Sequence, residues 1–304
     1  MAEPAPDELS RLRAEIDRLD DAVVDLLLER IAVVRRIGEV KTNATGLALR
    51  PSREADLIRR LTARAAPALP PAALTRMWRE LLATTTRMQT PFKVAVLDDP
   101  AQPHVATLAR DQFGTTTPLV MVETVHQGFR LIATGEAELL VVPAPTEDSY
   151  WWRRVTATLI DSPLRVVSRL PFCPFDPVAG DAENGEARAG DLVPGALVLG
   201  GLVAEPSSAD LTLVAIETDL DLSRARQRDL IAAGGVDLVS LVALRDLQPE
   251  SAFFIAEVAG MGDAVLAGLG QAFAPLRERL LRLDVLGSYP RPLGVIADPS
   301  DSDA

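Results

Sequence analysis

The stretch LRAEIDRLDDAVVDLLLERIAVVRRIGEVK, residues 12–41, decides the fold of the first third of the chain. Its apolar residues recur about three to five positions apart, which is the periodicity of an amphipathic helix. The pattern runs without a break from Leu9 to about Lys41, so it predicts one unusually long helix. The stretch around 42–51, which includes Asn43 and Gly46, breaks the pattern.

Two shorter helices are predicted next. Ser52 occupies a typical N-cap position and Glu54 falls in the first turn, so the second helix is expected to run to about Ala66. Prolines separate it from a third helix, predicted from about Ala72 to Gln89 with apolar residues along one face. The first part of the chain is therefore expected to be all-α.

Beyond Pro91 short apolar runs alternate with helical patterns, which predicts an α/β region. The segment 171–193 is rich in proline, glycine and acidic residues and is predicted to be a loop. The apolar runs before and after it are KVAVL (93–97), PLVMV (118–122), ELLVV (138–142), LRVVS (164–168) and ALVLGGL (196–202).

After about residue 207 the predicted order is strand, helix, strand, strand, helix, strand, which is the order of a ferredoxin-like module. Its second helix is expected over 263–283 and its last strand over 284–287. The chain is thus expected to be multidomain, with an all-α domain at 1–91, an α/β domain at 92–206, and an α+β domain with a short tail at 207–304.

Composition excludes several classes of function. The formal net charge is −12, so non-specific nucleic-acid binding is disfavoured. One cysteine and two histidines make a metal site of the Cys/His kind nearly impossible, and neither a metal nor a cofactor is expected. No apolar run approaches the roughly 18 residues of a membrane span, and the first residues do not resemble a signal peptide, so a cytoplasmic protein is expected.

Positive charge is concentrated in the helical part. Residues 1–91 hold 15 Lys and Arg against 13 Asp and Glu, whereas the remainder holds 16 against 30. The first part therefore carries +2 and the rest −14. The local field therefore favours an anionic ligand in the helical region.

The long helix can be used as a ruler. Arg30 and Lys41 are eleven residues apart, so they lie within about 20° of one face and about 16 Å apart, and could converge on one small anion. Lys41 is one of only two lysines in an arginine-rich chain. Arg13 precedes Arg30 by seventeen residues, about 25 Å, so a functional Arg13 would have to serve a site completed by another chain.

Smaller polar groups accompany these cations. Thr85 and Gln89 are one helical turn apart and present a hydroxyl and an amide on one stripe. Arg53 and Glu54 open the second helix. Taken singly, each of these residues is typical of a solvated surface.

Taken together they carry a family resemblance. The run quoted above, then RPSREADLIRRL (50–61) and MWRELLATTTRMQ (77–89), resembles the all-helical class of chorismate mutases. The arrangement is similar to the beginning of the bifunctional chorismate mutase-prephenate dehydratases. The resemblance covers nearly all of residues 9–90, and it extends to the spacing of the charged residues as well as to their types.

The resemblance implies a site shared between two subunits. Arg30 and Arg53 would bind the carboxylates of chorismate within one subunit, and Arg13 would reach in from the partner of a homodimer. Thr85 would contact a carboxylate. Arg50 occupies a substrate-binding position that is often acidic in the family.

The resemblance also implies which groups act on the reacting atoms. Lys41 and Gln89 would contact the ether oxygen that gains negative charge, and Glu54 would bind the ring hydroxyl. The implied reaction, chorismate to prephenate, is an intramolecular rearrangement that needs no proton transfer, metal or nucleophile. Clamping the folded conformer and placing donors at the developing charge are sufficient mechanisms.

The second half resembles a prephenate dehydratase from Phe129 to Phe172, and its ending LDVLGSYPRPL (283–293) resembles the close of the ACT domain of that family. The catalytic signatures are replaced: DDPAQPH (98–104) stands where the glycine-rich turn is expected, and Pro145, Thr146 and Glu147 stand near the Glu-Asn-Ser position. One loop, 171–193, occupies the place of the second lobe.

Three functions remain open from the sequence. The first is a chorismate mutase whose dehydratase-like region is inactive, and the second is a working bifunctional mutase-dehydratase. The third is a catalytically dead regulatory or binding protein.

Trp151 with Trp152 is more typical of a core or an interface than of a ligand face, and Cys173 has no histidine near it in sequence.

Overall fold

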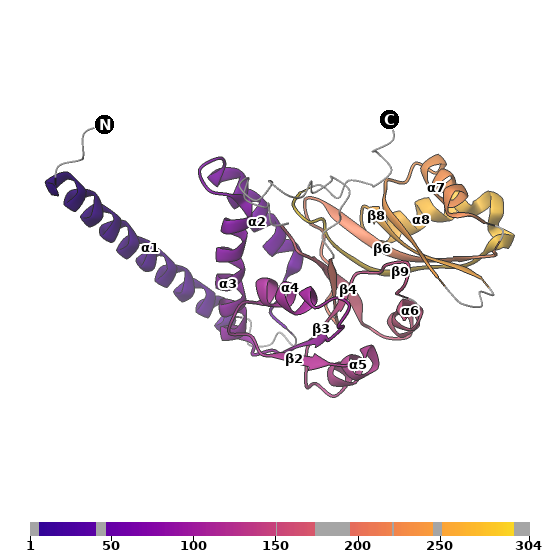
Figure 1. The fold of residues 1–304 in the computed structure, drawn as a ribbon, viewed down its shortest axis with the longest axis horizontal. Helices are drawn as coiled ribbons and strands as arrows, with labels where there is room; N and C mark the ends of the chain where they lie inside the picture. Colours follow the sequence, from indigo (N-terminus) through magenta and orange to yellow (C-terminus); the bar gives the residue numbers. More distant parts are fainter. Residues whose placement is uncertain are drawn as a thin grey trace. The chain divides into compact units, whose positions relative to one another are not determined.

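The computed structural model describes residues 6–40, 47–149, 151–173, 195–220, 222–245 and 251–294 (Figure 1). By its internal contacts the chain divides into two compact units. The first comprises residues 1–48 and 85–91, and the second comprises 49–84 and 92–304. Among the helices in the described ranges, none is both long and apolar enough to cross a bilayer.

Helix α1, Pro6–Val40, forms most of the first unit and has 35 residues, so the prediction of one long helix is confirmed. Much of its apolar stripe is exposed to solvent in the single chain. The exposed side chains spaced along it include Leu12, Ile16, Leu19, Val23 and Leu26. A helix with so wide an uncovered apolar stripe ordinarily packs against another surface.

Helices α2, Pro51–Ala65, and α3, Pro71–Gln89, fall within two residues of their predicted positions. The predicted N-cap at Ser52 is wrong, because Arg50 holds that position and Pro51 is the first helical residue. Proline suits the first turn because its missing N–H would have no helical partner there. The Ser52 hydroxyl instead donates to the carbonyl of Glu205.

The α/β region forms a five-stranded sheet in the order β2-β1-β3-β5-β4. Strand β1 is parallel to β2 and β3, while β5 runs antiparallel to β3 and β4. The elements are β1 Val94–Leu97, α4 His104–Phe113, β2 Leu119–Val122, α5 Val125–Ala133, β3 Leu139–Pro143, α6 Trp152–Ile160, β4 Arg165–Leu170 and β5 Ala196–Gly200. All five predicted strands are confirmed, and of the predicted loop only its first residues lie within the described ranges.

The last region has the predicted βαββαβ order, with an antiparallel sheet in the order β7-β8-β6-β9. Its elements are β6 Asp210–Thr218, α7 Arg224–Ala233, β7 Leu238–Leu244, β8 Ala252–Ala259, α8 Gly262–Phe273, the 3-10 helix η1 Ala274–Arg279 and β9 Leu280–Pro290.

One boundary in this region was predicted wrongly. The helix expected over 263–283 ends as an α-helix at Phe273, and the last strand begins at Leu280 rather than at Asp284. Pro275 interrupts the helix, since proline lacks the N–H that an inner turn requires. Beyond it, antiparallel pairing of β9 with β6 overrides the local helical pattern.

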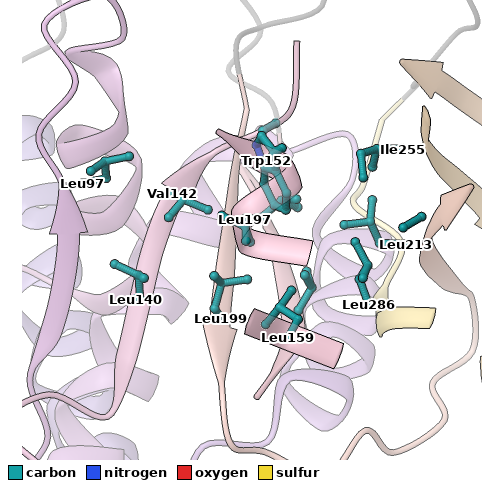
Figure 2. Close-up of a cluster of buried hydrophobic side chains, with 14 of the residues drawn as sticks. Leu97, Leu140, Val142, Trp152, Leu159, Leu197, Leu199, Leu213, Ile255 and Leu286 are labelled. Atoms are coloured by element: carbon teal, nitrogen blue, oxygen red, sulfur yellow. The ribbon is translucent and has the colours of Figure 1, made fainter. Parts of the chain in front are cut away.

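The two sheets share one hydrophobic core (Figure 2). Leu197 of β5, Trp152 of α6 and Leu286 of β9 belong to the same buried cluster. A Cβ placed on Gly287 would lie 2.1 Å from the carbonyl oxygen of Val166, so only glycine allows β9 to approach β4 this closely. The β4–β5 side of the α/β sheet is thus fixed against the βαββαβ module, which leaves the other end of that sheet, at β1 and β2, for a site.

The tryptophan pair lies at the start of α6. Trp151 and Trp152 stack with ring centroids 5.5 Å apart, and Trp152 is fully buried with its indole N–H donating to the carbonyl of Pro143. The expectation that the pair fills a core is confirmed for Trp152.

Candidate active site

Two of the predicted arginines lie on α1. Arg13 and Arg30 share this unbroken helix, so their seventeen-residue separation corresponds to about 25 Å along its axis. Arg13 is exposed and Arg30 is half-buried. Lys41 follows the end of α1 and lies outside the described residues.

The end of α3 brings two further candidates together. The side-chain amide of Gln89 donates to the backbone carbonyl of Thr85, with Nε2 and the oxygen 3.3 Å apart. A Cβ placed on Gly38 of α1 would lie 3.7 Å from Cγ of Gln89. Gln89 therefore lies beside Gly38 in the last turn of α1. In the sequence, Gly38 precedes Lys41 by three residues.

The start of α2 holds the remaining three candidates, and they face different surroundings. Arg50 forms an ion pair with Glu205, and both side chains are nearly half exposed. Arg53 is exposed. Glu54 is buried, although it is the next residue, because successive helical residues are turned by about 100°.

Glu54 forms a buried ion pair with Arg79 of α3. Arg79 Nη1 lies 2.7 Å from Glu54 Oε2, and each residue is less than a tenth exposed. Burial lowers the pKa of the Arg79 guanidinium, and the charge of Glu54 offsets part of that effect. The guanidinium carbon also lies 5.2 Å from the ring centroid of Phe172.

Arg79 is not among the site residues predicted from the sequence. A signal was present, since Arg79 stands one turn after Thr75 and three residues before Leu82, on the apolar face of α3. An arginine on a buried helix face needs a counter-charge. The identity of that partner, 25 residues earlier in the chain, follows only from the packing of α2 on α3.

The predicted site residues thus divide between the two compact units. Arg13, Arg30, Thr85 and Gln89 belong to the first unit, and Arg50, Arg53 and Glu54 belong to the second. Within the first unit, the structure brings Gln89 and Thr85 together at the end of α1. Within the second, it places Glu54 inward against Arg79 and Arg53 outward.

The α/β region has a separate cavity of about 730 Å³, here called the β1–β2 cavity. It opens at the carboxyl ends of β1 and β2, where parallel sheets commonly bind ligands. Its charged lining is mainly acidic: Asp98, Asp99 and Glu123, with Arg154 as the arginine among the described lining residues. Phe129 and Trp151 add aromatic surface. Such a lining favours a cation over a dicarboxylate.

Glu147, at the position where the dehydratase signature was expected, is engaged elsewhere. Its carboxylate pairs with Arg224 at 3.1 Å and with Arg245 at 2.8 Å, so it ties the loop after β3 to the βαββαβ module.

The helical region matches a known protein family. Residues 12–90 match the family described as chorismate mutase type II. The bifunctional chorismate mutase/prephenate dehydratase of Aquifex aeolicus (strain VF5) is 33% identical over 142 residues, which are 45% of this chain and 39% of that protein. The match thus spans about two fifths of the length of that curated relative.

Two solved structures that are similar to the chain are described with different activities. The prephenate dehydratase from Streptococcus mutans has 16% sequence identity and a TM-score of 0.40, over 66% of this chain and 98% of that one. GqqA, described as a novel type of quorum quenching acylase, has 16% identity and a TM-score of 0.42, over 69% of this chain and 98% of that one.

Proposed function

Since residues 12–90 form a chorismate mutase domain of type II, homologous to that of the bifunctional enzymes, we propose that this chain catalyses the rearrangement of chorismate to prephenate. The observation that supports this most is the position of Gln89, held by the Thr85 carbonyl beside the last turn of α1. There its amide can act together with Lys41, three residues beyond Gly38, on one oxygen atom of the substrate.

The proposed mechanism is electrostatic. Arg30 and Arg53 hold the two carboxylates of chorismate, with Thr85 as an additional donor, so that the substrate is kept in its folded, reactive conformer. Lys41 and Gln89 stabilise the negative charge that grows on the ether oxygen as the bond breaks. All bonds form and break within the substrate, so the protein need not supply or remove a proton.

Glu54 is proposed to bind the ring hydroxyl, and its pairing with Arg79 gives this role a physical basis. A carboxylate held at 2.7 Å by a buried arginine is fixed in orientation. Arg79 thereby becomes a positioning residue for Glu54. Arg50, engaged with Glu205, is proposed to border the substrate rather than to act on the reacting atoms.

The active form is proposed to be a homodimer in which Arg13 enters the site of the partner. The separation of Arg13 from Arg30 along α1 supports this, because both cannot reach one small substrate from the same straight helix. The exposed apolar stripe of α1 supports it further, since a second copy would cover that stripe.

The α/β region is proposed to lack dehydratase activity and to serve as a scaffold, with an ACT-like module after it. The acidic lining of the β1–β2 cavity supports this, because prephenate carries two carboxylates. The pairing of Glu147 with two arginines also supports it. The alternative is a bifunctional enzyme. It is favoured by the similarity of the chain to proteins described as bifunctional chorismate mutase/prephenate dehydratases.

One experiment separates these functions. Purified full-length protein is incubated with chorismate, and prephenate and phenylpyruvate are followed by chromatography. Prephenate alone is the expected result. Phenylpyruvate in addition would establish the bifunctional alternative, and neither product would indicate a catalytically dead regulatory protein.

A further inference from the structure

A second, smaller cavity lies where α3, α4 and the end of β4 meet, and it is here called the α3–α4 cavity. Its volume is about 200 Å³. Thr75 and Arg79 line it from α3, Leu108 from α4, and Leu170 and Phe172 from the end of β4 and just beyond. Arg76, Thr107, Asp111 and Gln112 line it as well, and Arg76 is paired with Asp111 at 2.9 Å. Apolar and polar side chains therefore share the walls.

Two of the polar side chains, those of Thr75 and Arg79, present atoms without a hydrogen-bond partner in the part of the chain that the structure describes. These atoms are Nε of Arg79 and Oγ1 of Thr75. Arg79 is 4% exposed and Thr75 is 6% exposed, so neither atom is hydrated by bulk solvent. The two residues are one turn apart on α3 and face the same cavity.

Two unsatisfied polar atoms on one cavity wall require an explanation. Buried donors and acceptors in folded proteins nearly always have partners, because leaving one unpaired is costly in free energy. The guanidinium of Arg79 already donates to Glu54 through Nη1, so its Nε–H is directed elsewhere. An acceptor that fits between this N–H and the Thr75 hydroxyl would satisfy both.

We propose that the α3–α4 cavity binds a small carboxylate with a compact apolar body, and that its occupancy is transmitted through Arg79 to Glu54. One carboxylate oxygen accepts from Arg79 Nε–H, and the other accepts from the hydroxyl of Thr75. The apolar part lies against Leu108, Leu170 and the ring of Phe172. A planar anion suits the guanidinium because its N–H groups lie in one plane.

Transmission follows from the sharing of one cation by two anions. Among the described residues, Glu54 is the acidic residue that forms an ion pair with Arg79. A bound carboxylate takes part of that attraction, so Glu54 is held less firmly. This step rests on the proposed function of Glu54, and it predicts that the ligand lowers kcat/KM for chorismate. By linkage, whatever factor the carboxylate costs chorismate in equilibrium binding, chorismate costs the carboxylate in return.

The test uses benzoate as the probe and benzyl alcohol as its neutral counterpart. Calorimetric titration of the full-length protein is expected to show saturable binding of benzoate with one site per chain and none of benzyl alcohol at the same concentrations. Absence of benzoate binding would overturn the proposal. Equal binding of the two probes would also overturn it, because the cavity would then select apolar volume rather than a carboxylate.

Three variants assign the binding to this cavity. Thr75→Val removes the hydroxyl at nearly constant volume and is expected to weaken benzoate binding about tenfold, the effect of one lost hydrogen bond. Ala72→Leu, on the cavity wall, is expected to abolish binding by filling the space. Thr156→Val is the matched control, since Thr156 also has a buried, unpartnered hydroxyl but lies on α6 outside this cavity. Thermal midpoints verify that each variant is folded.

The mutase assay tests transmission and separates it from competition at the chorismate site. Saturating benzoate is expected to lower kcat/KM of the wild type, and Thr75→Val is expected to need about tenfold more benzoate for the same decrease. Equal inhibition of the wild type, Thr75→Val and Ala72→Leu would mean that benzoate binds the active site, which contradicts the proposal. Benzoate binding by a protein without mutase activity would overturn the proposed function and leave the carboxylate site standing.

Discussion

The helical region and the α/β region offer opposite charge to a substrate. The residues proposed to bind chorismate are cations for the most part, namely Arg13, Arg30, Lys41 and Arg53. The β1–β2 cavity, at the edge of the sheet where a ligand would be expected, is lined mainly by carboxylates. A dicarboxylate substrate is attracted by the first arrangement and repelled by the second.

The difference teaches that a complete fold does not by itself establish what a region binds or catalyses. Strands β1, β3 and β5 are buried along their whole length, and side chains from the two sheets fill one core. Those residues determine the sheet, whereas the residues at its edge determine what it can bind. The presence of the sheet is therefore no argument for activity.

The largest expected effect follows from removing a cation of the helical region. Lys41→Ala and Arg30→Ala are each expected to lower kcat/KM for chorismate by several orders of magnitude, beyond the about 10² to 10³ that one oxyanion donor contributes. Each substitution removes a fixed cation from the charge of the transition state. Steady-state kinetics of prephenate formation provides the measurement.

Matched controls exist for both substitutions. Lys93→Ala removes the other lysine of the chain, and Arg18→Ala removes an exposed arginine of α1 that has no proposed role. Both controls are expected to retain near wild-type kinetics. If Lys41→Ala or Arg30→Ala kept more than about a tenth of the activity, the site assignment would be wrong.

The next largest expected effect is on stability. It concerns a buried carboxylate between the α/β sheet and the βαββαβ module. Glu257 of β8 accepts hydrogen bonds from Arg169 and Tyr289 at 2.6 Å each and from Ser240 at 2.9 Å, so this buried carboxylate is fully engaged. Glu257→Gln leaves the charge of Arg169 without its counter-charge. The free energy of unfolding is expected to fall by about 3–5 kcal/mol, measured by urea denaturation.

An exposed pair supplies the control for Glu257→Gln. Glu147→Gln breaks the pairing with Arg245, whose side chain is 71% exposed, and is expected to cost less than about 1 kcal/mol. Folded Glu257→Gln is also expected to keep its mutase kinetics at 25 °C. Loss of mutase activity in the folded variant would show that the two regions are not functionally separate.

Subunit complementation tests the sharing of the helical site. An Arg13→Ala chain and an Arg30→Ala chain, each nearly inactive, are mixed under conditions that permit exchange. In a mixed dimer one site holds both arginines and the other holds neither, so random pairing should restore about a quarter of wild-type activity. No recovery, with exchange verified by native mass spectrometry, would show that the two arginines do not meet across an interface.

Local patterns in the sequence predicted most of the fold. The periodicity of residues 12–41 predicted α1 to within a few residues, and five apolar runs predicted the five strands of the first sheet. The errors occurred where distant parts of the chain decide the outcome. The segment from Leu280 to Leu283 has a helical pattern, but it pairs with β6, more than sixty residues earlier in the chain.

The candidate site shows the same division. Spacing along one helix indicated that Arg30 and Lys41 could converge on one anion and that Arg13 could not join them from the same chain. The roles proposed for these three residues come from the family resemblance. The partner of Glu54 could not be found in this way, since Arg79 meets it only through the packing of α2 against α3. Nor does the sequence alone reveal that Thr75 and Arg79 line a cavity.

The smallest expected effect is a pH dependence from Tyr289, which belongs to the buried network in the second region. Burial raises the pKa of Tyr289 well above 10.0, and the charge of Glu257 adds to that effect. The folded protein therefore retains this proton at a pH where the unfolded chain has lost it. Above about pH 10 stability should fall with rising pH, since the folded state then binds more protons than the unfolded state.

In Tyr289→Phe this contribution is absent, so its free energy of unfolding should decline less steeply between about pH 10 and 11 than that of the wild type. Urea denaturation at closely spaced pH values measures the two slopes. Below about pH 9 the two proteins should instead differ by a constant offset from the lost hydrogen bond to Glu257. Parallel curves above pH 10 would contradict the assignment of a raised pKa to this tyrosine.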